Sequence, residues 1–220
     1  MNLLEFSTAW DPEVLGVNNG IYQLEFDESV FNNESESDDF FLNFPRDITK
    51  PITKPLNFTL LKKGKINDIM RYAPILKPAP YIVSEKFIEV LREFDTLPYS
   101  LEPVSFLNVK VDMKYFLFRY TYSDLSDFNV KRIIAYLGIT KNSRRYYEFS
   151  DLSEFQLFNN KNKMCQIEKI EFSLQDSKVK DYVKLIKPGD MISESLANGL
   201  IERGVTGVKI GKVCIMEAVD

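Results

Sequence analysis

The sequence contains no histidine among its 220 residues. Histidine is the side chain whose ordinary pKa lies closest to neutral, so its absence excludes the usual Ser-His and Cys-His nucleophiles and His-ligated zinc. Glycine is scarce, with 9 residues, and neither a G-x-G-x-x-G nor a P-loop spacing occurs. The calcium-loop pattern with its central glycine is also missing. The sequence therefore predicts no cofactor and no metal site.

Long apolar runs and an excess of positive charge are missing as well. No apolar run approaches the roughly 20 residues that span a bilayer, and Glu5 lies where the apolar part of a secretory signal would be. The formal charge is −4, which gives no electrostatic basis for binding nucleic acid. Cys165 and Cys214 lie in apolar strand-like segments, typical of reduced buried thiols, and a disulfide between them is the less favoured alternative. Together these features predict a cytoplasmic protein.

The apolar residues follow both strand and helix periodicities. Gln166–Leu174 alternates apolar and charged residues, as a half-buried strand does. Ser84 precedes Phe87 and Leu91 at helical spacing, so we expect it to be the N-cap of a helix. Val130–Leu137 fits either a strand or a helix. The sequence predicts an α+β fold, with a mixed or antiparallel sheet and a few flanking helices.

Two segments begin in the same way. Both place an apolar residue, a serine and a glutamate before an amphipathic helix, and the match continues at a constant offset. The corresponding pairs are Val83/Ile192, Ser84/Ser193, Glu85/Glu194, Phe87/Leu196, Leu91/Leu200 and Glu93/Glu202. A duplicated strand-helix-strand unit explains the match, and so does a capping pattern that two unrelated helices can share. The sequence leaves both explanations open.

The domain organisation is inferred from how composition and pattern change along the chain. Residues 1–80 are irregular, with strand-like fragments, several prolines and an acidic loop. Residues 81–220 read as an α+β domain. The prolines lie among apolar residues and no Gly/Ser-rich spacer separates the two parts, so we expect them to pack as one compact unit.

The acidic segment 27–39 is the main candidate site. It carries six carboxylates and no positive charge, and such a run is most often a solvated loop. The functional alternative is a surface that docks into a positively charged cleft of another protein, where carboxylates steer the approach and aromatic rings anchor it. The candidate residues are Asp27, Glu28, Phe31, Glu34, Glu36, Asp38, Asp39, Phe40 and Phe41.

Several short motifs follow one another in the C-terminal half. They are Asp151–Phe155, the strand Ile167–Leu174, the short element Asp181–Leu185, the helix start Ile192–Ala197 and the turn Gly204–Val208. This order resembles a family of bacterial polymorphic-toxin immunity proteins, first catalogued as a domain of unknown function. In that family the short element carries a phenylalanine-arginine pair. Val183 and Lys184 stand there in this chain, which departs from the family pattern but keeps an apolar residue before a basic one.

The resemblance implies a cytosolic antidote without enzymatic activity, which binds one toxin tightly enough to prevent self-killing. It transfers no catalytic residue and does not identify the toxin. The expected partner is a toxin with a basic or cleft-like surface, and whether the protein also forms a homodimer is left open.

Two other functions compete with this one. A hydrolase working with carboxylates alone would use a pair such as Asp124 and Asp127, or Asp151 and Glu154. Aspartates in such Ser- and Leu-containing turns more often cap a helix, so catalytic carboxylates should converge in a pocket whereas caps should point at backbone amides. A general interaction module that binds a host protein is the third reading.

Overall fold

The fold is α+β, as expected, in a computed structural model that describes residues 2–18, 22–42, 47–76, 79–121, 130–139, 141–162, 165–172, 180–184 and 190–217. These residues form a seven-stranded sheet, in the order β11-β10-β12-β15-β1-β14-β13, and two four-stranded sheets, β5-β2-β3-β8 and β4-β6-β9-β7. The strands are β1 (Leu3–Thr8), β2 (Leu24–Phe26), β3 (Asn57–Leu60), β4 (Ile69–Met70), β5 (Tyr72–Ala73), β6 (Tyr81–Ser84), β7 (Tyr99–Pro103), β8 (Ser105–Phe106), β9 (Tyr115–Tyr120), β10 (Val130–Leu137), β11 (Arg145–Phe149), β12 (Gln166–Phe172), β13 (Tyr182–Lys184), β14 (Asp190–Ser193) and β15 (Val208–Glu217). The helices are α1 (Pro12–Leu15), α2 (Glu34–Leu42), α3 (Glu85–Leu91), α4 (Leu152–Lys161) and α5 (Glu194–Glu202), with short 3-10 turns η1 (Glu28–Val30) and η3 (Lys141–Ser143).

The two segments that match in sequence belong to two units of the same topology. In each unit the strand before the helix, β6 or β14, pairs antiparallel with β4 or β13 on one side and with a central strand on the other. The strand after the helix, β7 or β15, pairs antiparallel with that central strand. The central strand is β9 in the first unit and β1 in the second. The match therefore reflects a repeated structural unit and not only shared capping.

The registers of the two units agree as well. Ser84 at the end of β6 lies opposite Tyr115 at the start of β9, and Ser193 at the end of β14 lies opposite Leu3 at the start of β1. Both serines are N-caps, as the sequence predicts: Ser84 Oγ accepts from the Phe87 N–H (3.2 Å) and Ser193 Oγ from the Leu196 N–H (3.0 Å). Each cap satisfies a backbone donor that the first turn of a helix leaves open.

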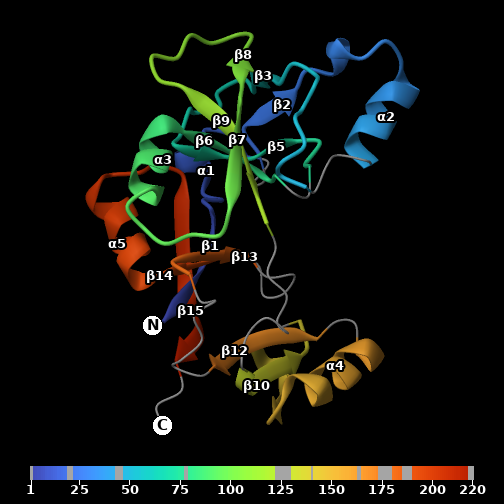
Figure 1. The fold of residues 1–220 in the computed structure, drawn as a ribbon, viewed down its shortest axis with the longest axis vertical. Helices are drawn as coiled ribbons and strands as arrows, with labels where there is room; N and C mark the ends of the chain where they lie inside the picture. The colour runs from blue at the N-terminus through green and yellow to red at the C-terminus, as the bar shows by residue number, and fades with distance from the viewer. Residues whose placement is uncertain are drawn as a thin grey trace.

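Helices α3 and α5 lie side by side and join the units (Figure 1). Gly199 allows the close approach, because a Cβ atom there would lie only 3.1 Å from the ring of Phe94. The largest core cluster fills the space between the units, with Phe6, Phe87, Phe118 and Leu196 among its buried members. Burying this apolar surface is the main stabilising term of the junction.

The loop after each helix makes hydrogen bonds to the first strand of the other unit. The buried carboxylate of Asp68 accepts from the Ser84 hydroxyl (2.7 Å) and from the N–H (2.8 Å) and hydroxyl (2.9 Å) of Thr206, which follows α5. Asp181, at the matching place in the second unit, accepts from the N–H of Asp95 after α3 (3.0 Å) and donates its own N–H to the Asp95 carbonyl (2.6 Å). The contacts are reciprocal, as in a two-fold symmetric interface.

The remaining elements attach at the two ends of the junction (Figure 1). Sheet β5-β2-β3-β8 covers a third core cluster with α2 beside it, and α4 covers one face of β10, β11 and β12 over a second cluster that holds Cys165. Val130–Leu137 is a strand. The side chain of Cys214 lies outside the described residues. Residues 1–80 and 81–220 share sheets, since β1 lies between β14 and β15, and β4 pairs with β6.

Replacing Asp68 tests the junction. Asp68→Ala removes three hydrogen bonds from a buried carboxylate and leaves buried donors unmatched, so we expect the free energy of unfolding to fall by about 3 kcal/mol. Asp151→Ala, which removes an exposed N-cap, should cost only about 1 kcal/mol. Urea unfolding of both variants measures the difference, and equal losses would contradict the role given to Asp68.

Candidate functional site

The acidic segment is not the loop that its composition predicts. It forms η1 and the nine-residue helix α2. The start of α2 is reciprocally capped: Asn33 Oδ1 accepts from the Glu36 N–H (2.9 Å), and the Glu36 carboxylate accepts from the Asn32 N–H (2.7 Å). Asn, Ser and Asp favour turns when nothing else holds the chain, but capping together with an apolar helix face favours the helix here.

Phe40 and Phe41 form that apolar face, and Phe31, which precedes the helix, packs against them. The rings of Phe31, Phe40 and Phe41 lie 5.9, 6.0 and 5.5 Å from the ring of Phe26, and the Phe26 ring lies 5.3 Å from that of Phe58 in the sheet. Each of the three is half-buried against the third core cluster. Aromatic pairs of this kind are worth about 0.5–1.5 kcal/mol beyond their buried area. These rings therefore hold α2 and η1 to the sheet.

Asp27, Glu28 and Glu36 make contacts within the segment and with Lys54. Asp27 accepts from the Ser29 N–H (3.2 Å), Glu28 accepts from the Ser37 hydroxyl (2.9 Å), and Glu36 pairs with Lys54 (2.5 Å). The hydrogen bond from Lys54, aided by the Asn32 N–H, lowers the pKa of the Glu36 carboxyl. The other three carboxylates are exposed on α2, and we call them the outer face: Glu34, Asp38 and Asp39.

The helix dipole does not account for the whole outer face. The C-terminal end of a helix carries partial negative charge and favours basic side chains. Asp38 lies at the middle of α2, and Asp39 begins its last turn, which has no basic residue. Capping of the N-terminus cannot explain these two carboxylates, because both lie beyond the first turn. A residue that breaks a local rule of stability is a candidate for function.

The segment after α2 is fixed by a buried arginine. Arg119 is only 1% exposed, and its guanidinium donates to the carbonyls of Asp47 (2.7 Å) and Lys50 (2.9 Å) and to Glu102 (2.6 Å). Lys54, a little further along, makes the ion pair with Glu36. Helix α2 thus stands at the edge of the molecule in Figure 1 but is attached on both sides.

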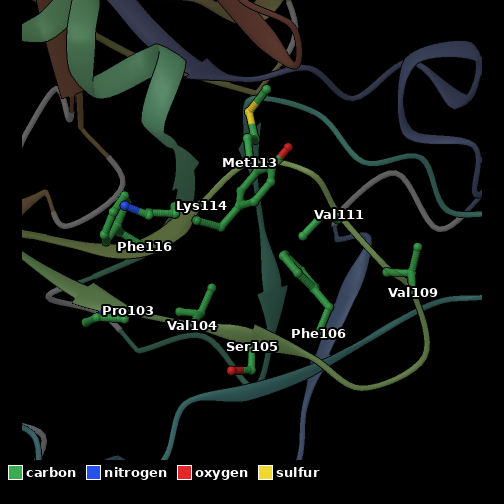
Figure 2. Close-up of a pocket in the computed structure, with 10 residues that line it drawn as sticks. Pro103, Val104, Ser105, Phe106, Val109, Val111, Met113, Lys114 and Phe116 are labelled. Atoms are coloured by element: carbon green, nitrogen blue, oxygen red, sulfur yellow. The ribbon is translucent and has the colours of Figure 1, made fainter.

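A second surface feature is an apolar hollow of about 720 Å³ between β8 and the start of β9 (Figure 2). Figure 2 shows Phe106, Val111 and Met113 around it. Two lining residues are titratable, Lys114 and Tyr115. Burial, with a smaller contribution from the charge of Asp68, raises the pKa of Tyr115 to about 12. The hollow therefore offers apolar contact and no group suited to general base catalysis at neutral pH.

The carboxylate pairs of the hydrolase hypothesis have different outcomes. Asp151 and Glu154 form a reciprocal cap on α4, since Asp151 accepts from the Glu154 N–H (2.8 Å) and Glu154 accepts from the Ser150 N–H (3.4 Å). They point at backbone amides, as caps do. Asp124 and Asp127 lie outside the described residues. Within the described ranges, no group of three or more Cys, Asp or Glu side chains is placed to hold a metal ion.

The described helices include none that has the length and hydropathy needed to cross a bilayer. Comparison with protein-family models, with curated proteins and with solved structures gives no match. The motifs that carry the resemblance to immunity proteins lie at the start of α4, in β12, around β13 and at the start of α5, with the closing turn before β15. Those motifs belong to the scaffold. Membership of the immunity family therefore stays a prediction.

Sequence reasoning missed the residues that position the site. Arg119 is the basic residue within the aromatic strand Tyr115–Tyr120. A charged residue in a strand otherwise suited to the core was the signal that could have identified it. Asp68, which positions the junction, gave no signal, because it is recognisable only through a partner far away in the chain.

The attachment of α2 should depend on pH through Glu36. Its pKa is lowered in the folded state, so the Glu36 contacts stabilise α2 above the ordinary glutamate pKa of about 4.3 and are lost as the pH falls through the lowered pKa. Carbon-13 chemical shifts of α2 between pH 7 and pH 3 measure this. Glu36→Gln should reduce helicity already at pH 7 and flatten the acid response, whereas Glu34→Gln should keep the wild-type profile. An unchanged profile in Glu36→Gln would exclude this role.

Proposed function

We propose that this chain is an immunity protein, which binds a single bacterial toxin and blocks it without chemistry of its own. The observation that carries the proposal is the outer face: three exposed carboxylates on one helix, whose last turn contains Asp39 and no basic residue. The resemblance of the C-terminal motifs to toxin immunity proteins supports the same class. The capping role of Asp151 and Glu154 takes away one basis of the hydrolase alternative.

The outer face would act first on the rate of association. A cluster of like charges on one exposed helix attracts a basic surface over distances of about a Debye length, roughly 8–10 Å at physiological salt. Because α2 is fixed by Phe26, Lys54 and Arg119, little conformational entropy is lost when a partner docks on it. The remaining exposed edges of Phe31, Phe40 and Phe41 adjoin the carboxylates and would make the apolar contacts.

The class of function is tested with this protein as bait, in cells that express its neighbouring gene products. We expect one captured protein to be lethal when expressed alone and harmless when co-expressed with this chain. Growth rescue is the readout, and co-expression of an unrelated acidic protein is the control. Capture of a partner that is not toxic would replace the immunity proposal with a general interaction module.

The role of the outer face is tested separately by charge reversal. In the double variant Glu34→Lys with Asp38→Lys, association with the captured toxin should slow by about tenfold at low salt, with a smaller change in dissociation. The matched control is Glu89→Lys with Glu202→Lys, which reverses two exposed carboxylates on α3 and α5. Stopped-flow or surface-based kinetics at two salt concentrations distinguish them. Equal association rates for both double variants would place the interface elsewhere.

A further inference from the structure

A polar cavity of about 270 Å³ lies at the seam between the two repeated units. Tyr81 begins β6 and Asp190 begins β14, so the two residues occupy matching positions in their units and meet across the junction. Cavities at the boundary between structural units are common places for ligand binding. The lining residues are Glu5, Phe6, Ser7, Trp10, Arg71, Tyr81, Asp190 and Met191.

The acidic side of the cavity already has its hydrogen bonds. The Asp190 carboxylate accepts from the hydroxyls of Tyr81 (2.7 Å), Tyr120 (3.0 Å) and Tyr182 (3.3 Å). Burial, more than the nearby carboxylate, raises the pKa of these three hydroxyls well above the ordinary tyrosine value. They remain donors at any pH near neutral. Asp190 is thus a satisfied part of the cavity wall and has little need of a cationic ligand.

The guanidinium of Arg71, in contrast, has a donor without an acceptor. It links β4 to β5, where its backbone carbonyl accepts from the Gln23 N–H (3.1 Å), and its side chain lines the cavity. The guanidinium is hydrogen-bonded to the Tyr81 side chain and lies 5.8 Å from the centre of its ring, but its Nε–H is enclosed without an acceptor. Within the described ranges Arg71 has no carboxylate at ion-pairing distance. An enclosed arginine donor without an acceptor is unusual and calls for one.

The surrounding groups add further donors. Trp10 is 53% exposed and contributes an indole N–H, and the ammonium of Lys209 lies 4.2 Å from the Trp10 ring. The Ser7 hydroxyl already donates to the Thr8 carbonyl (3.3 Å). Glu5 also lines the cavity, and its negative charge opposes an anionic ligand, most strongly one that carries more than one negative charge. The volume suits a group of about amino-acid size, below the range of 300–1,000 Å³ that is usual for larger ligands.

We propose that this cavity is a binding site for a monocarboxylate group, with Arg71 as its ionic partner and Trp10 as one wall. A planar carboxylate matches the paired N–H groups of a guanidinium, and the Trp10 and Phe6 rings would cover the apolar remainder of the ligand. The carboxylate belongs either to a small organic acid or to an acidic side chain of a partner chain. The site uses no residue of α2 or η1, so it stands independently of the outer face.

Trp10 supplies the test, because it is the single tryptophan of the chain. The full-length protein is titrated at constant ionic strength with propionate and, in parallel, with propionamide, which has a similar shape and no charge. We expect the Trp10 fluorescence emission to change saturably with propionate and not with propionamide. Arg71→Gln should weaken propionate binding by at least about tenfold, the effect of losing a charged hydrogen bond. Arg145→Gln, a change to an exposed arginine on β11, should leave it unchanged.

A second variant and a second ligand complete the design. Arg71→Lys keeps the charge without the planar fork, so it should bind more weakly than wild type and provides the comparison if Arg71→Gln does not fold. A capped tripeptide with a central glutamate presents a side-chain carboxylate: tighter binding than propionate assigns the site to a partner's acidic residue, and weaker binding assigns it to a small acid. Equal responses to propionate and propionamide, or unchanged affinity in both Arg71 variants, would overturn the proposal.

Discussion

The reciprocal junction between the two repeated units is the constraint on which the other features depend. Asp68 receives three hydrogen bonds, one from its own unit and two from the loop after α5, and Asp181 makes the matching contacts with the loop after α3. Hydrogen bonds of a buried carboxylate are geometrically demanding, so they fix the relative position of α3 and α5 while the apolar cluster between them supplies most of the stability. This junction positions the elements attached at its two ends and the cavity between the two units.

The outer face is held in place by contacts with the rest of the fold. Aromatic rings hold α2 to one sheet, Lys54 holds it through Glu36, and Arg119 reaches from β9 to fix the segment in between. Asp27, Glu28 and Glu36 make the contacts described above, and Glu34, Asp38 and Asp39 are exposed. An acidic segment that looks uniform in sequence is thus divided by the structure into residues that build a helix and residues that a partner could contact.

Local signals in the sequence were sufficient for the helices that begin at Ser84 and Ser193, because an N-cap acts within four residues of itself. They failed for the acidic segment, where composition favoured a loop and the decisive contacts with Phe26 and Lys54 are made by residues outside it. In the sequence, the repeated unit showed only as the match between the two helices capped by Ser84 and Ser193. Its completion by β1 could not be predicted, since only Phe6 and Phe118 are the same residue at equivalent positions of β1 and β9, and β1 is placed by strand pairing. The same limit hid Arg71, whose neighbours in the cavity come from three other parts of the chain.

The position of β1 has a consequence for how the chain is made. Leu3 pairs with Ser193 and with Ile215, so the central strand of the second unit is synthesised long before its two neighbours. Until β14 and β15 have left the ribosome, this strand has neither of its partners, and the sheet can close only through contacts between distant residues. Such topologies fold slowly and expose unpaired edges meanwhile. Assembly of the second unit therefore has to wait for the synthesis of both β14 and β15.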